Sequence, residues 1–156
     1  MNELKVRQSI YINQPLEGVF PFVSDLENLV DWSSIVISAR RTSSEAIQVG
    51  ATVRSTLHFL GRWFDITFEV VECEPGRSMM IKSISGAASC YIDFRFDPVV
   101  DGGTIVSQEA VFHLIDGVIE QAEPVVTSAV RRQLEYDLLT LKDILETRAL
   151  MIGTAE

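Results

Sequence analysis

The fold of this chain is decided by residues 122–147, AEPVVTSAVRRQLEYDLLTLKDILET. Apolar side chains recur there at steps of four, four, seven and four residues, which places them in one stripe along an α-helix. They are Val126, Val130, Leu134, Leu141 and Leu145. A helix of this length is roughly 39 Å long and about 10–12 Å wide. The stretch therefore predicts one long amphipathic helix.

Seven shorter segments before that helix have the alternating apolar and polar residues of β-strands, with turn residues between them. The expected strands are Lys5–Ile12, Ile35–Thr42, Ala51–Leu60, Trp63–Glu74, Ser78–Ile84, Ser89–Asp97 and Thr104–Leu114. The short connections among the last six allow only antiparallel neighbours. We expect a type II′ turn at Gly61-Arg62, where a Gly-X pair joins two of these strands.

Two short helices are expected between the first and second strands. The first begins near Pro15, which is tolerated at the first helical position, and Pro21 should kink or end it. The second is expected to begin with a capping box formed by Ser24 and Glu27 and to end around residues 30–32.

The dimensions of these elements indicate how they pack. Seven strands spaced about 4.8 Å apart form a sheet roughly 29 Å across, which is too wide for one helix to cover if the sheet is flat. We therefore expect a single α+β domain over residues 1–156, with a core from about residue 5 to residue 147. Its seven-stranded antiparallel sheet should curl around the long helix, and the space that remains should form a cavity.

Composition narrows the classes of partner. The chain carries a net charge of −9, so most of its surface should repel nucleic acid. It has no apolar run typical of a signal peptide or a membrane span, so we expect a cytoplasmic protein without stable membrane insertion. Cys73 and Cys90 belong to no Cys/His cluster, and we expect free thiols, no metal site and no cofactor.

Strand alternation predicts which side chains face the long helix. The expected inner face is aliphatic, aromatic and sulfur-bearing, with Ser55, Ser83 and Gln108 as its other polar groups. Its candidate ligand-binding residues are Ser55, Leu57, Phe59, Phe68, Met79, Ile81, Phe94, Gln108 and Phe112 from the strands, with Val130, Leu134 and Leu141 from the helix. Such a wall suits an apolar ligand fixed by a few hydrogen bonds. Ordinary core packing is the alternative for most of these side chains.

Asp137 is the anomaly of the long helix, because it lies inside the apolar stripe. A carboxylate at such a position is costly unless it is paired, hydrated or protonated. It is a candidate polar anchor or catalytic acid/base within the cavity. The alternative is a structural role, with the carboxylate in water or paired with a basic neighbour.

The order of elements, together with several local motifs, resembles the helix-grip fold of the START/Bet v 1-like (SRPBCC) superfamily. Within it, the chain is similar to the polyketide cyclase/dehydrase and lipid-transport group. The motifs are Ile12-Asn13 through Pro15, Val19-Phe20, Val23-Ser24-Asp25, Trp32, Glu74-Pro75-Gly76-Arg77, Leu141-Lys142-Asp143 and Leu145-Glu146.

The resemblance implies a deep hydrophobic cavity whose mouth is bordered by the small helices, with Trp32 near that mouth as a ligand-binding residue. The sequence departs from the group at Ser33-Ser34, where many relatives have proline. Aromatase/cyclase members work through Arg and Tyr inside the cavity, and the expected inner face here has no arginine. Quinone-binding relatives have mostly apolar cavities.

The leading hypothesis is therefore binding or carriage of a small hydrophobic molecule, such as a lipid, polyketide, isoprenoid or quinone. The alternative is a polyketide cyclase, aromatase or dehydrase-type enzyme that uses the same cavity with Asp137 as its catalytic group. A third hypothesis is a protein-interaction module that uses the outer sheet face or an edge strand. Leu139 lies opposite the apolar stripe and could join a homodimer contact.

Overall fold

The computed structural model describes residues 2–43, 48–86, 89–114 and 123–154. In chain order the elements are β1 (Asn2–Ile12), α1 (Leu16–Ser24), the 3-10 helix η1 (Leu26–Asn28), α2 (Leu29–Trp32), β2 (Val36–Arg41), β3 (Thr52–Phe59), β4 (Arg62–Glu74), β5 (Ser78–Ser85), β6 (Ser89–Pro98), β7 (Thr104–Leu114) and α4 (Glu123–Thr154). This order confirms the α+β class, with short helices between the first two strands.

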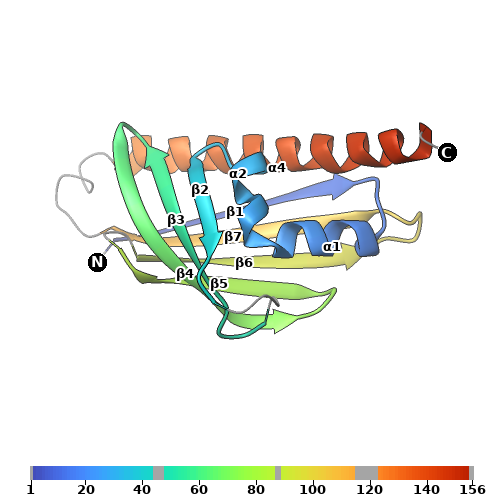
Figure 1. The fold of residues 1–156 in the computed structure, drawn as a ribbon. Coiled ribbons are helices and arrows are strands. Elements are labelled where there is room, and N and C mark those ends of the chain that lie inside the picture. The colour runs from blue at the N-terminus through green and yellow to red at the C-terminus, as the bar shows by residue number, and fades with distance from the viewer. Residues whose placement is uncertain (1, 44–47, 87–88, 115–122, 155–156) are drawn as a thin grey trace.

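The seven strands form one antiparallel sheet in the order β1-β7-β6-β5-β4-β3-β2. Register shifts mark bulges at Ile37 in β2, Val71 in β4 and Ile84 in β5, and such bulges strengthen the bend of a sheet. Figure 1 shows β2 and β3 rising steeply from the rest of the sheet, with α4 running along β1. The predicted curved sheet around a long helix is confirmed.

α4 is longer than the sequence pattern predicted. It runs on to Thr154 rather than ending at Thr147, while its expected first residue, Ala122, lies outside the described residues. The buried face contains the predicted Val130, Leu134, Asp137, Leu141 and Leu145, and it also includes Leu138. Leu138 lies about 80° around the helix from Val130, so it belongs to the edge of a stripe at least 100° wide.

The predicted capping box is wrong. Ser24 is the last residue of α1, and its hydroxyl donates to the Pro21 carbonyl oxygen (3.5 Å). The next helix is capped by Asp25, whose backbone is extended and whose carboxylate accepts from the Glu27 N–H at 3.2 Å. Pro21 lies inside α1 and does not end it there, since one missing N–H removes only one hydrogen bond of the helix.

The tight turn between β3 and β4 also differs from expectation. Phe59 pairs with Arg62, so the loop is Leu60-Gly61 and not Gly61-Arg62. Both loop residues have positive φ, 51° at Leu60 and 76° at Gly61. This is the pattern of a type I′ turn, whose twist matches that of the flanking strands. A leucine in this left-handed conformation is strained.

Relief of this strain gives a first prediction. Leu60→Asn should raise the free energy of unfolding by about 0.5–1 kcal/mol, because asparagine tolerates positive φ and Leu60 is exposed, so little packing is lost. Urea denaturation measures the effect, with Leu60→Ile as the matched control that should lower the midpoint. Equal midpoints for all three proteins would contradict the account of this turn.

The buried apolar side chains fall into two clusters. The larger joins the short helices and all seven strands to α4, through Leu138, Leu141 and Leu145. The smaller lies between β1, β7 and the earlier part of α4, and its buried members are Leu4, Val6, Ala110, Val130 and Leu134.

Candidate functional site

The structure places the predicted site residues in the interior between the sheet and α4. Twelve of them are buried: Trp32, Ser55, Leu57, Phe68, Met79, Ile81, Phe94, Gln108, Val130, Leu134, Asp137 and Leu141. Phe59 and Phe112 are half-buried and pack against the smaller cluster. Ser83 has a structural partner, because its hydroxyl oxygen accepts from the Cys90 N–H at 3.0 Å.

Three side-chain atoms in this interior are buried without a hydrogen-bond partner among the described residues. They are Trp32 Nε1, Ser55 Oγ and Gln108 Oε1. The exposed fractions of the three residues are 2%, 0% and 4% respectively. Buried polar atoms nearly always have partners, and an unpartnered one costs about 1–3 kcal/mol. These three atoms are polar groups whose hydrogen-bonding capacity the protein's own described residues leave unsatisfied.

Two of these three residues are linked through Phe94. Gln108 in β7 lies directly opposite Phe94 in β6, and the Trp32 ring stands edge-on to the Phe94 ring with centroids 6.2 Å apart. Trp32 and Gln108 therefore approach Phe94 from α2 and from the sheet.

Gln8 is a further polar residue of this face that the sequence analysis missed. It lies opposite Gln108 in the β1–β7 pairing, and its neighbours on the same side of β1 are apolar. Val6 belongs to the smaller cluster, while Ile10 packs against the larger one. The alternation of apolar residues from Leu4 to Ile12 is the signal that places Gln8 on the inner face.

Part of the concave face is incompletely covered. Ile92 lies between Ile81 and Ala110, which are both fully buried, yet it keeps an intermediate exposure and packs against both clusters. Phe59 and Phe112 have the same intermediate exposure at the smaller cluster. Inward-facing side chains in this region thus keep accessible apolar surface, as a ligand-binding wall requires.

Asp137 is buried, with an exposed fraction of 1%, and both of its carboxylate oxygens have partners. The Ser34 N–H donates to Oδ1 at 3.0 Å, and the Gln133 amide donates to Oδ2 at 2.8 Å. Burial raises the pKa of this carboxyl group, and the hydrogen bonds from Gln133 and Ser34 oppose that rise only in part. The carboxylate links α4 to the turn after α2. Both of these hydrogen-bond donors, the Ser34 N–H and the Gln133 amide, are neutral groups.

The cysteines are free thiols, as expected. Burial raises the pKa of Cys90 to about 11 and also raises the pKa of Cys73. A thiol with a raised pKa is a poor nucleophile at neutral pH. Neither cysteine is therefore a candidate catalytic group.

The curved sheet that holds a long helix over an apolar inner face defines a helix-grip domain. The chain belongs to the polyketide cyclase / dehydrase and lipid transport family, whose model matches residues 3–146. A comparison of the sequence with curated proteins found no match.

Solved structures share the fold at low identity. TTHA0849 from Thermus thermophilus matches with a TM-score of 0.80 and 20% identity, over 92% of this chain and 98% of that one. The Zhui aromatase/cyclase from Streptomyces sp. R1128 matches with a TM-score of 0.79 and 14% identity, over 95% of this chain and 96% of that one. A START superfamily protein from Mycobacterium smegmatis matches with a TM-score of 0.75 and 14% identity, over 92% of this chain and 98% of that one.

The helices of the described residues are each too short or too polar to span a lipid bilayer.

Proposed function

We propose that this protein binds and carries a small hydrophobic molecule in the interior between its sheet and α4. The observation that carries the proposal is the set of three buried, unpartnered polar atoms at Trp32, Ser55 and Gln108 in the described part of the chain. A ligand that hydrogen-bonds to them would remove their desolvation cost, while its carbon skeleton buries apolar surface at about 25 cal/mol per Å². The family description, which includes lipid transport, agrees with this role.

The charge of the inner face indicates a neutral ligand. The described inward-facing positions of β1 and of strands β3 to β7 carry no Lys, Arg or His, and Arg41 on the inward side of the edge strand β2 is paired with Glu27. The buried ionisable side chain of the described part of α4 is the acidic Asp137. An anion placed there would lose its hydration without gaining a cationic partner. Trp32 supplies a donor, and the Ser55 hydroxyl and the Gln108 amide can each donate or accept. We therefore favour a polyketide, quinone or isoprenoid alcohol over a fatty acid anion.

A variant with one tryptophan tests this proposal. Trp63 is 64% exposed and stacks on His58, so Trp63→Phe leaves Trp32 as the only tryptophan in a chain that has two. Titration with 1-decanol should change the Trp32 emission with saturation. Decanoate should do so at least about tenfold more weakly, because its carboxylate must be desolvated. Saturation by decanoate at the lower concentration would contradict a neutral site.

An enzyme acting on a polyketide-like substrate in the same interior is the second candidate, with Asp137 as its acid or base. The raised pKa of the buried carboxyl group favours this role. The hydrogen bonds to both oxygens favour a positioning role instead. If Asp137 is catalytic, Asp137→Asn should abolish turnover and spare ligand binding, whereas unchanged turnover would remove Asp137 from the mechanism.

The expected partners and location remain part of this proposal: a small hydrophobic ligand, no nucleic acid and a cytoplasmic protein. The net charge of −9 supports the absence of nucleic acid. Leu139 is exposed on α4 and is available for a homodimer contact.

A further inference from the structure

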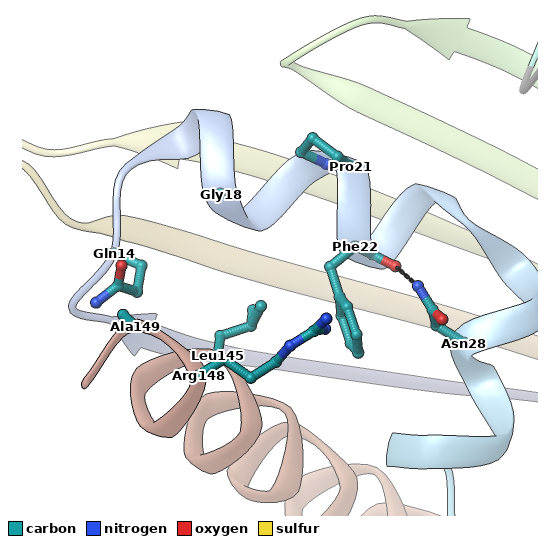
Figure 2. Close-up of a pocket in the computed structure, with 8 residues that line it drawn as sticks. All are labelled: Gln14, Gly18, Pro21, Phe22, Asn28, Leu145, Arg148 and Ala149. Atoms are coloured by element: carbon teal, nitrogen blue, oxygen red, sulfur yellow. Dashed lines mark hydrogen bonds between the residues drawn. The ribbon is translucent and has the colours of Figure 1, made fainter. Parts of the chain in front are cut away.

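A separate groove lies on the outside of the molecule between α1 and the last turns of α4 (Figure 2). Its volume is about 400 Å³, which falls within the usual range of small-molecule sites. Two segments far apart in the sequence form it, one running from Gln14 to Asn28 and the other from Leu145 to Ala149. None of the polar atoms of the interior site lines this groove, so it is independent of the proposed function.

The inner wall of the groove is apolar. Phe22 extends from α1 and Leu145 from α4 into the space between the two helices, and both are largely buried members of the larger cluster. A ligand in the groove would therefore lie against the outer side of a packed core. This surface suits a short hydrocarbon chain or an aromatic ring.

Arg148 supplies the charge of the groove. Its guanidinium group lies over the Phe22 ring, 5.1 Å from the ring centroid. Within the described part of the chain it forms no ion pair, and the residues three and four positions away along α4 are all apolar. A guanidinium stacked on a ring keeps its N–H edge available for a carboxylate.

The rest of the rim is neutral or open. The Gln14 amide lies at one end of the groove, and the Asn28 amide donates to the Phe22 carbonyl oxygen at 3.1 Å, which leaves its own oxygen at the rim. A Cβ atom built on Gly18 would meet no other described atom within 4 Å. The groove thus has an apolar wall, one cation and free space at a helical glycine.

We propose that this groove is a second binding site, which takes a small amphipathic carboxylate. The apolar body of the ligand would lie against Phe22 and Leu145, and its carboxylate would bind Arg148. The chemistry is opposite to that of the interior, where the described inward-facing positions of β1 and of strands β3 to β7 lack a cation.

Calorimetric titration with octanoate, combined with ¹H–¹⁵N correlation spectra, tests this site. The Gly18 amide and the Arg148 side-chain Nε–H signals should shift on saturation. Arg148→Gln should weaken octanoate binding about tenfold or more, and Arg148→Lys should weaken it less, because the charge remains but the bidentate geometry is lost. Gly18→Leu should abolish binding by filling the groove, while Gly18→Ala should bind octanoate within about threefold of the original protein and melt at a higher temperature.

Two controls separate this proposal from the proposed function. Gln108→Met, a change in the interior, should leave octanoate binding unchanged. Arg148→Gln should leave the decanol response of Trp32 unchanged, and because Arg148 is exposed this variant should fold even if Gly18→Leu does not. Absence of octanoate binding, or equal binding by the original protein and Arg148→Gln, would overturn the groove site without affecting the interior one.

Discussion

Replacement of Gln108 by methionine should stabilise the ligand-free protein and impair ligand binding. Gln108 Oε1 is buried without a partner among the described residues, and methionine has a similar length without the amide group. We expect Gln108→Met to raise the free energy of unfolding by about 1–3 kcal/mol, the usual cost of such an atom. Affinity for a hydrogen-bonding ligand should fall by about tenfold or more, because the ligand loses a buried partner.

Urea denaturation and decanol titration of the single-tryptophan protein measure these two effects. Gln48→Met is the matched control, because it makes the same chemical change at an exposed position and should alter stability by less than about 0.5 kcal/mol. A Gln108→Met protein that is less stable and binds decanol equally well would show that Gln108 is a structural residue. Opposite changes in stability and affinity are typical of a residue retained for function.

Replacement of Asp137 by alanine should lower the free energy of unfolding by about 2 kcal/mol. The Ser34 N–H and the Gln133 amide would both lose their acceptor, and a small void would form at a buried position. The link between α4 and the turn after α2 would be lost. Trp32 is the last residue of α2, so it lies next to this turn. We therefore expect the Trp32 emission of Asp137→Ala to change as well.

Asp137→Asn is the conservative control, since it keeps an acceptor for Ser34 and removes the charge. The pKa of Asp137 is raised above its ordinary value of 3.8, so the folded protein binds more protons than the unfolded chain between 3.8 and the raised pKa. The stability that protonated Asp137 contributes is therefore complete below pH 3.8. It is lost as the pH rises through the pKa that Asp137 has in the folded protein. The stability of Asp137→Asn relative to the original protein should increase from about pH 3.5 to about pH 7. A difference that does not vary with pH would contradict the raised pKa.

Most of the fold could be predicted because its signals are local. The period of the apolar residues placed the buried face of α4, and strand alternation placed Ser55 and Gln108 on the inner face. The same alternation also identifies Gln8, which the sequence analysis overlooked. Local signals gave the wrong residue at two positions. Asp25 caps the helix that Ser24 was expected to cap, and the tight turn is formed by Leu60-Gly61 and not by the expected Gly61-Arg62.

The contacts that decide function are not local. One of the two partners of Asp137 is the Ser34 N–H, 103 positions away in the chain, and this contact depends on how the turn after α2 docks against α4. The missing partners of Trp32, Ser55 and Gln108 become evident only when all neighbouring described elements are in place. Likewise, the outer groove exists because the end of α4 lies beside α1, and the sequence alone did not indicate it.

The central claim is that the unpartnered interior atoms bind a neutral hydrophobic ligand, and native mass spectrometry of the purified protein tests it most directly. The original protein and Gln108→Met should be prepared from the same host, and any bound small molecule should be extracted and identified. We predict one neutral, oxygen-containing hydrophobic molecule per chain in the original protein and strongly reduced occupancy in Gln108→Met. Equal occupancy in the two proteins, or an anionic molecule held in the interior, would contradict the account.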